Sequence, residues 1–289
     1  MLLISQTTFA LELSGKTINV VIPFPPGGGV DMTFQSLKRF AETQNINLVA
    51  VYKPGAEGII GMTELHSMPN DGLHAGIATI AVIGTYWQQR NEDLVPLMGL
   101  RNGTNILIVN SKSNVKNFSD FIGSLKGNKN FTLGYGAPGQ KFLLEQLLSL
   151  SKAENYSLVP YKGGSQVLND LLGGHIGAAF LPTNIVMKHI ESGALRPIAF
   201  NGNKLPDNIK VPTMRSLYSN WEHFDWFCFI LPPNTSEQVK TTWVKLLKQY
   251  LQDPKVLKGF AEEYTDIVPT DQQSAKNAVK SYMKRAELK

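Results

Sequence analysis

The chain has 289 residues and a mass of 31.9 kDa, which exceeds what one compact core usually holds and suits two α/β domains. Hydrophobic residues make up 43% of it, as in a folded protein, and the formal net charge is only +5. Because no run of Lys and Arg and no basic face with aromatic residues stands out, the sequence argues against a nucleic-acid partner.

The N-terminal segment, residues 1–10, is an apolar stretch that ends in a small residue, Ala10, and contains no basic residue. It resembles the end of a secretory signal peptide, with cleavage after Ala10. An ordinary frayed N-terminus explains the segment equally well. No stretch of the sequence is long and apolar enough to span a membrane.

The sequence next predicts a strand, a glycine-rich loop and a helix. The β-branched run at 18–22 is typical of a buried strand, and Pro23 ends it because proline has no N–H for the sheet ladder. Asp31 then caps or opens a helix. Three residues of the intervening loop lack a Cβ atom: Gly27, Gly28 and Gly29. Such a backbone beside a helix N-terminus favours an anion, although many loops of this kind are only turns.

A second apolar strand at 48–52 is followed by another glycine-bearing loop at 53–61. The carboxyl ends of neighbouring parallel strands meet at one edge of a sheet, where ligands of open sheets bind. We therefore expect the two loops to lie side by side and to hold one carboxylate with backbone N–H groups.

Later segments indicate how the chain divides. Residues 76–83 are predicted to form a third strand and its exit, and a crossing strand follows at 106–109, with a hinge close to Thr104. The run at 226–231 is predicted to cross back. These crossings divide the chain into a first lobe of residues 11–104 plus 225–289 and a second lobe of residues 105–224.

Several helix starts and packing roles are expected from local residues. Thr183 is expected to cap one helix, and Thr235 is expected to begin a capping box in the C-terminal part. Another cap is expected at Thr270. Tyr86 or Trp87 could wall a cleft, but packing is the safer interpretation.

One glycine pattern imitates a nucleotide site. Gly134, Gly136 and Gly139 match the spacing G-x-G-x-x-G between a strand and a helix. The fingerprint also needs an acidic residue after the next strand, where this chain has Tyr161 and Lys162. We therefore expect no nicotinamide cofactor, and what remains is a helix N-terminus that favours an anion.

Catalytic and metal motifs are missing from the sequence. The five histidines show no metal-binding spacing, and neither a Gly-x-Ser-x-Gly elbow nor a phosphate-binding loop occurs. Cys228, the single cysteine, lies in the apolar run 226–230, where a buried inert thiol is expected. The sequence thus favours binding over catalysis and predicts no metal or cofactor.

Several stretches, taken in order, resemble the periplasmic solute receptors of tripartite tricarboxylate transporters, the Bug family. They read Pro-Phe-Pro-Pro-Gly-Gly-Gly-Val-Asp at 23–31, Lys-Pro-Gly-Ala-Glu-Gly-Ile-Ile-Gly at 53–61, Pro-Asn-Asp-Gly at 69–72, and Val-Pro-Tyr-Lys-Gly at 159–163, leading to Asp-Leu-Leu-Gly-Gly at 170–174. The resemblance runs from about Thr17 to the C-terminal helices. It implies an α/β fold of the two-lobe type II periplasmic-binding-protein architecture, with a ligand cleft between the lobes.

The resemblance also implies a set of ligand-binding residues. They are Phe24, Gly27, Gly28, Gly29 and Asp31 in the first loop, Gly55, Ala56 and Gly58 in the second, and then Thr79, Ala137, Pro138 and Gln140. Phe24 would offer apolar contact, whereas Asp31 is expected to orient its loop rather than touch an anion.

This chain departs from the family at a few positions. Glu57 stands where relatives usually have glycine, and Leu181 and Pro182 stand where they usually carry an acidic residue. A carboxylate pointing inward would repel an anion, so either Glu57 points to solvent or the ligand carries a cation or fewer charges. Lys53 and Lys141 also replace familiar residues, and either could reach the cleft.

The function implied by the resemblance is capture of a small mono- or dicarboxylate in the periplasm. A monomeric, secreted receptor would hand this ligand to the membrane permease subunits of a tripartite tricarboxylate transporter. Two alternatives stay open at this point: a receptor that senses a ligand for a signalling partner, and an enzyme of the same architecture that acts on a carboxylate.

Overall fold

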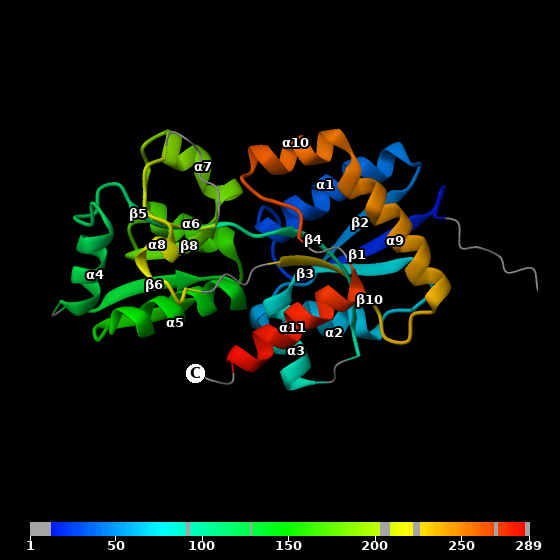
Figure 1. Ribbon diagram of the computed structural model, residues 1–289, viewed down its shortest axis with the longest axis horizontal. Coiled ribbons are helices and arrows are strands. Elements are labelled where there is room, and N and C mark those ends of the chain that lie inside the picture. The colour runs from blue at the N-terminus through cyan, green and yellow to red at the C-terminus, as the bar shows by residue number, and fades with distance from the viewer. Residues whose placement is uncertain are drawn as a thin grey trace, which may run out of the picture.

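The computed structural model describes residues 13–90, 93–127, 129–202, 209–221, 226–268 and 271–286. These residues form two bodies side by side, each built on a five-stranded sheet flanked by helices (Figure 1). The signal-peptide prediction for residues 1–10 and the expected cap at Thr270 lie outside the described residues. Within those ranges, no helix combines the length and the apolar character that crossing a membrane requires.

We call the body that contains the first strands of the chain lobe 1. Its sheet has the order β2-β1-β3-β10-β4, with β1 parallel to β2 and β3, and β10 antiparallel to both of its neighbours. The strands are β1 (Thr17–Ile22), β2 (Asn47–Tyr52), β3 (His74–Thr79), β4 (Val95–Asn102) and β10 (Trp226–Leu231). The three parallel strands therefore place the chain segments that follow them at one edge of the sheet.

Lobe 1 is completed by helices from both ends of the chain. They are α1 (Gly29–Thr43), the short 3₁₀ turn η1 (Ala56–Gly58), α2 (Ile59–Ser67), α3 (Ile80–Gln89), α9 (Glu237–Gln252), α10 (Pro254–Glu262) and α11 (Gln272–Ala286). Trp243 of α9 is fully buried, and its ring centroid lies 4.5 Å from that of Phe229 on β10. The C-terminal helices thus belong to the core of the lobe that begins the chain.

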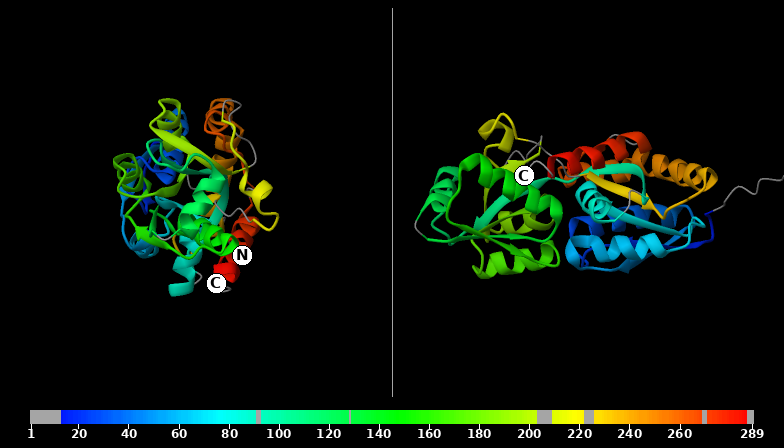
Figure 2. Two further views of the ribbon diagram at one scale, coloured as in Figure 1. Left: turned by 90° about the vertical axis from the view of Figure 1, so that its left-hand side faces the viewer. Right: turned by 90° about the horizontal axis from the view of Figure 1, so that it is seen from below.

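Lobe 2 has the sheet order β7-β6-β8-β5-β9, in which β6 runs parallel to β7 and β8. Its strands are β5 (Asn105–Asn110), β6 (Phe131–Tyr135), β7 (Tyr156–Pro160), β8 (Ala178–Pro182) and β9 (Leu195–Asn201). Its helices are α4 (Phe118–Lys126), α5 (Pro138–Ser151), α6 (Gly164–Gly173), α7 (Thr183–Glu191) and α8 (Met214–Leu217). Viewed from below in Figure 2, an extended segment joins this lobe to lobe 1.

The connection between β4 and β5 is short, because β4 ends at Asn102 and β5 begins at Asn105. Our boundaries between the lobes, after residue 104 and at residue 225, stay a proposal, and residue 225 lies outside the described ranges. The strands of each sheet are nevertheless grouped as Figure 1 shows, with β5 to β9 in lobe 2.

The strand predicted at 76–83 is wrong beyond Thr79. There β3 ends and α3 begins, because the Thr79 hydroxyl accepts a hydrogen bond from the Val82 N–H at 3.3 Å and caps the helix. Residues 80–83 are all buried, so their apolar run has no helical period to distinguish it from a strand.

Two predicted helix caps are also wrong. The Thr183 hydroxyl donates to the backbone carbonyl of Thr104 at 3.1 Å instead of capping α7. The Thr235 hydroxyl bonds to a backbone carbonyl before the helix, and Ser236 caps α9 by accepting from the Val239 N–H at 3.3 Å. In each case a neighbouring residue takes the N-cap position.

Candidate ligand-binding site

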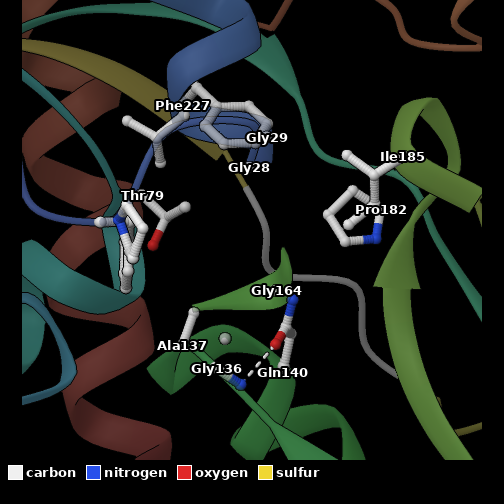
Figure 3. A pocket seen from close by; sticks show the side chains of 14 residues that line it. Gly28, Gly29, Thr79, Gly136, Ala137, Gln140, Gly164, Pro182, Ile185 and Phe227 are labelled. Atoms are coloured by element: carbon white, nitrogen blue, oxygen red, sulfur yellow. Dashed lines mark hydrogen bonds between the residues drawn. The ribbon is translucent and has the colours of Figure 1, made fainter. Parts of the chain in front are cut away.

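A cavity of about 40 Å³ lies between the lobes (Figure 3). Lobe 1 lines it with Phe24, Pro25, Gly28, Gly29, Val30, Thr79 and Phe227, and lobe 2 lines it with Gly136, Ala137, Gly139, Gln140, Gly164, Pro182 and Ile185. None of these side chains is ionisable. The cavity therefore offers small and apolar side chains together with exposed backbone.

Five helices begin at the wall of this cavity: α1, α3, α5, α6 and α7. The first turn of any helix has N–H groups without an intrahelical partner and carries the positive end of the helix dipole. In four of the five, the N-cap residue is Gly28, Ala137, Gly163 or Pro182, whose side chains cannot cap, and no side-chain cap forms. Several backbone donors from both lobes therefore converge on one small volume, which favours an anion.

The glycine loop after β1 is held by a carboxylate. The Gly27 N–H donates to Asp31 Oδ2 at 2.8 Å, while the Tyr52 hydroxyl donates to Asp31 Oδ1 at 2.8 Å. The pKa of Tyr52 is raised to about 12. Burial is the largest cause, and the hydrogen bond to Asp31 and the negative charge of Asp31 add to it. Asp31 does not line the cavity, so it fixes the loop from behind.

Gly29 marks the closest approach of α1 to its surroundings. A Cβ atom built there would lie 3.1 Å from Cζ of Phe227 and 3.5 Å from Cγ of Pro182 on lobe 2. At Gly28 the nearest atom to such a Cβ would be the carbonyl oxygen of Pro25, at 3.9 Å. A side chain at position 28 would thus enter open space, whereas one at position 29 would press on both lobes.

Two polar side chains occur among the described lining residues, one on each lobe. Gln140 accepts a hydrogen bond from the Gly136 N–H at 2.7 Å through Oε1, which turns its amide nitrogen toward Gly164. Thr79 accepts from the Val82 N–H and keeps its hydroxyl hydrogen available. Both therefore have donors that a bound acceptor could use.

A family model described as "Tripartite tricarboxylate transporter family receptor" matches residues 37–288. The chain belongs to this receptor family. Protein BugT of Bordetella pertussis is 28% identical over 274 residues, which cover 90% of this chain and 84% of BugT. The sequence similarity between BugT and this receptor therefore extends over nearly the whole chain.

Two solved structures have the same fold as this receptor. The periplasmic binding protein BugD is 23% identical, with a TM-score of 0.85 and coverage of 94% of this chain and 96% of BugD. Rpa4515 of R. palustris, solved with adipate, is 21% identical, with a TM-score of 0.85 and coverage of 94% and 95%. The predicted family and the two-lobe periplasmic-binding-protein architecture are confirmed.

The receptor brings together half of the residues that the resemblance singled out. The cavity is lined by Phe24, Gly28, Gly29, Thr79, Ala137 and Gln140. Gly27 and Asp31 do not line the cavity and are hydrogen bonded to each other, and Pro138 lines a separate groove. Whether the lining residues touch a ligand stays a prediction.

The second glycine loop of the receptor does not line the cavity. Gly55, Ala56 and Gly58 are absent from its wall, although the loop packs beside the first one: a Cβ at Gly58 would lie 3.4 Å from Cβ of Pro23. Glycine is needed at 58 for the fold itself, because φ is +97° and the same Cβ would lie 2.9 Å from Val82. The loops are thus neighbours, as expected, but only the first one lines the cavity.

The charged residues that could have reached the cleft lie elsewhere. Lys53 forms an ion pair with Glu64 at 3.2 Å on the surface of lobe 1. Lys141 and Glu57 both line the separate groove between the lobes. Neither lysine lines the cavity of the receptor.

Sequence reasoning missed eight lining residues, namely Pro25, Val30, Gly136, Gly139, Gly164, Pro182, Ile185 and Phe227. Gly136 and Gly139 had a signal, because their loop was recognised as a helix start that favours anions. Phe227 also had one, since it lies in the predicted strand 226–231 that returns to lobe 1. For Ile185 the sequence holds no comparable signal.

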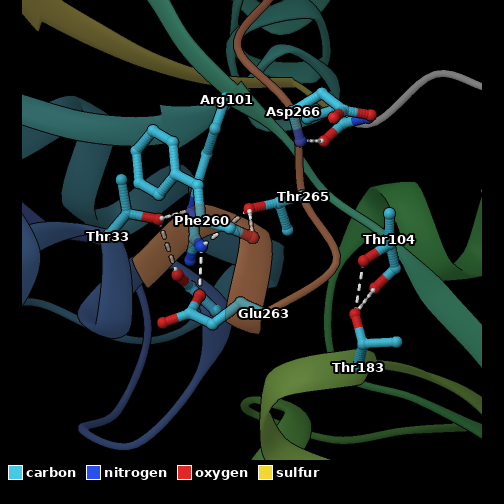
Figure 4. A network of polar contacts seen from close by, with 10 residues as sticks. Thr33, Arg101, Thr104, Thr183, Phe260, Glu263, Thr265 and Asp266 are labelled. Atoms are coloured by element: carbon cyan, nitrogen blue, oxygen red, sulfur yellow. Dashed lines mark hydrogen bonds and ion pairs between the residues drawn. The ribbon is translucent and has the colours of Figure 1, made fainter. Parts of the chain in front are cut away.

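A buried cation stands behind the wall of the receptor's cavity (Figure 4). The guanidinium of Arg101 lies 5.4 Å from the ring centroid of Phe227 and 5.3 Å from that of Phe260. It donates to Thr33 of α1 at 3.0 Å and forms an ion pair with Glu263. Arg101 therefore connects the first helix, the cavity wall and the C-terminal helices at the end of β4.

Cys228 and the aromatic residues of α3 belong to the core of the receptor. Cys228 is fully buried, and burial raises the pKa of its thiol to about 12. Tyr86 and Trp87 are 3% and 5% exposed and pack in the same core. Over the described ranges, no group of three or more His, Cys, Asp or Glu side chains is arranged to hold a metal.

Proposed function

We propose that this receptor captures a small mono- or dicarboxylate between its lobes, in the periplasm, as a monomer. It then delivers the ligand to the membrane permease subunits of a tripartite tricarboxylate transporter. The convergence of five helix N-termini from both lobes on a cavity without charged side chains supports this proposal most strongly. The adipate present in the structure of Rpa4515 supports a carboxylate ligand.

Backbone donors are sufficient in number and strength for such a ligand. A hydrogen bond to a charged acceptor contributes about 1.5 to 3 kcal/mol. A micromolar complex requires about 8 kcal/mol in all. Three or four N–H groups with some apolar contact would therefore bind a carboxylate without a lysine or arginine in the wall.

We assign roles to the residues of the cavity accordingly. The N–H groups at the starts of α1, α5 and α6 hold the carboxylate, and Thr79 and Gln140 add side-chain donors from opposite lobes. Phe24 and Phe227 supply apolar contact. Gly27 and Asp31 keep the first loop in shape. We assign no ligand contact to Gly55, Ala56, Gly58 or Pro138.

Isothermal titration calorimetry with a panel of acids tests this proposal. The protein is unfolded, dialysed and refolded to release any bound molecule, and is then titrated with acetate, succinate, malate and adipate. We expect at least one acid to bind with micromolar affinity. The matched control is the neutral amide of that acid, which has the same shape and no charge, and should bind at least 100-fold more weakly.

Two results would contradict the proposal. One is binding of the neutral amide as tight as that of the acid. The other is the absence of heat with every acid while an amine or a sugar binds. Mass spectrometry of the molecule released during unfolding gives an independent identification of the ligand class.

A further inference from the structure

Ile185 differs from the other large apolar side chains that line the cavity. Phe24, Val30 and Phe227 are 4% to 6% exposed and belong to the buried core of lobe 1. Ile185, in the first turn of α7, is only half-buried and packs against the edge of a core cluster in lobe 2. The fold therefore depends less on the size of Ile185 than on the size of the other three.

Lobe 2 approaches lobe 1 closely beside Ile185. A Cβ atom built at Gly163 would lie 2.8 Å from Cδ of Pro25 on lobe 1. At the next residue, Gly164, a built Cβ would lie 3.3 Å from Cδ1 of Ile185, so the end of this side chain lies against the first residue of α6 (Figure 3). Because the neighbouring wall is backbone, Ile185 is the side chain that limits the space at this end of the cavity.

The space that remains is small. A cavity needs roughly 10 to 15 Å³ for each water-sized group, so the volume of about 40 Å³ has room for about three such groups. An acid as short as acetate or propionate fits this space. A longer acid would have to bind with the lobes further apart, which would lose the backbone donors of one lobe.

The wall suits one carboxylate with a short apolar tail. Among the described lining residues, no side chain carries a charge. In so small a space, a second carboxylate of the same ligand would lie close to the first, with no cation in this wall to offset the repulsion. An apolar tail would instead gain from burial against side chains such as Ile185 and Phe227.

We propose that Ile185 is a specificity-determining residue that restricts the receptor to short monocarboxylates such as acetate and propionate. This inference rests on the proposed function, because it names the class of acid that the same cavity takes. Ile185 closes the end of the cavity beside α6. The tail of a longer acid therefore meets this side chain before the carboxylate reaches the helix N-termini.

Isothermal titration calorimetry with acetate, propionate, butyrate and hexanoate tests this inference. The protein is first unfolded, dialysed and refolded to release any bound molecule. For the unsubstituted protein, we expect acetate or propionate to bind most tightly and hexanoate to bind at least 100-fold more weakly. Malonate, which carries a second carboxylate in place of the methyl group of propionate, should bind at least tenfold more weakly than propionate.

Ile185→Ala should shift the preference toward longer acids, because removing most of the side chain extends the cavity beside α6. The ratio of the Kd for hexanoate to the Kd for propionate should fall at least tenfold. Ile185→Val should change this ratio in the same direction by less, and it is a mild substitution for the fold. Both affinities are measured in the same variant, so a loss of stability alone would not move their ratio.

Ile190→Ala is the matched control. Ile190 is a half-buried isoleucine of the same helix that packs against the same core cluster, and it does not line the cavity. This variant should keep the ratio of the unsubstituted protein.

Three results would overturn the inference while the proposed function stands. The first is hexanoate binding as tightly as propionate to the unsubstituted protein. The second is a ratio that Ile185→Ala leaves unchanged, and the third is malonate binding more tightly than propionate. If no acid of any length bound, the proposed function itself would fail, and this inference with it.

Discussion

Gly28 offers the most direct test of the cavity at the scale of one residue. Its φ of −88° and ψ of 175° suit any amino acid, and a Cβ there would enter open space beside the cavity. Gly28→Val should therefore leave the free energy of unfolding within about 1 kcal/mol, while its methyl groups block the approach of a ligand to the backbone. Calorimetry should show at least a 100-fold loss of affinity for the acid that the panel identifies.

Gly123→Val is the control for that substitution, because Gly123 lies in α4 with no atom within 4 Å of a built Cβ, far from the cavity lining. It should bind the acid normally. If Gly28→Val also bound normally with its fold intact, the first loop would not be part of the binding site.

At the scale of the element, local signals found most strands. The strands predicted at 18–22 and 48–52 lie within β1 and β2, and the crossing strand predicted at 106–109 lies within β5. Such features depend on residues close in sequence. The end of β3 was missed because residues 80–83 are buried on all sides, so the helix has no polar face in that turn.

Only half of the predicted site residues line the cavity, and the reason is physical. The sequence can place Gly28 and Gly58 at the same sheet edge, because each follows a parallel strand. Which loop reaches the cavity depends on how lobe 2 docks, and that is decided by contacts distant in sequence, such as Ser165 with Pro26 and Phe142 with Tyr282. No local pattern carries this information.

The link between the first loop and β2 should show itself as a pH dependence of stability. Below pH 10, Tyr52 is protonated in both the folded and the unfolded chain, so its hydrogen bond to Asp31 contributes fully. The folded pKa is raised to about 12, so as pH rises above 10 the unfolded chain loses its proton first, and the contribution falls until about pH 12.

Tyr52→Phe should accordingly reduce the free energy of unfolding by about 1 kcal/mol at pH 8 and by clearly less at pH 10.5. Urea unfolding of both proteins at the two pH values measures the difference. Tyr156→Phe, at an exposed tyrosine of β7, should have little effect at pH 8. A Tyr52→Phe penalty that stays constant or grows with pH would contradict the assigned hydrogen bond.

At the scale of the whole molecule, the end of β4 is where the chain leaves lobe 1, and it is fixed from several directions. Asn102 donates its backbone N–H to Asp266 at 2.9 Å and accepts from the Asp266 N–H at 2.7 Å through its side chain. Thr104 then bonds to Thr183 at the start of α7, so the crossing is anchored in both lobes (Figure 4). Arg101 extends this network to α1 and the cavity wall.

Removing the charge at Arg101 should be one of the most damaging single changes in the receptor. Its side chain is 2% exposed and its partner Glu263 is 23% exposed, so Arg101→Met leaves a largely buried carboxylate without compensation. We expect a loss of about 3 to 5 kcal/mol in the free energy of unfolding, measured with urea. Phe227 and α1 would also lose the group that holds them, so affinity for the acid should fall as well.

The double variant Arg101→Met, Glu263→Leu separates the charge from the packing. If Arg101→Met loses stability because the buried Glu263 carboxylate has no partner, removing both charges should restore most of the free energy of unfolding. Apolar side chains of similar size replace buried ion pairs at little cost. If the double variant is instead as unstable as the sum of the two single ones, the hydrogen bonds from Arg101 to Thr33 and Thr265 hold this junction, rather than the ion pair.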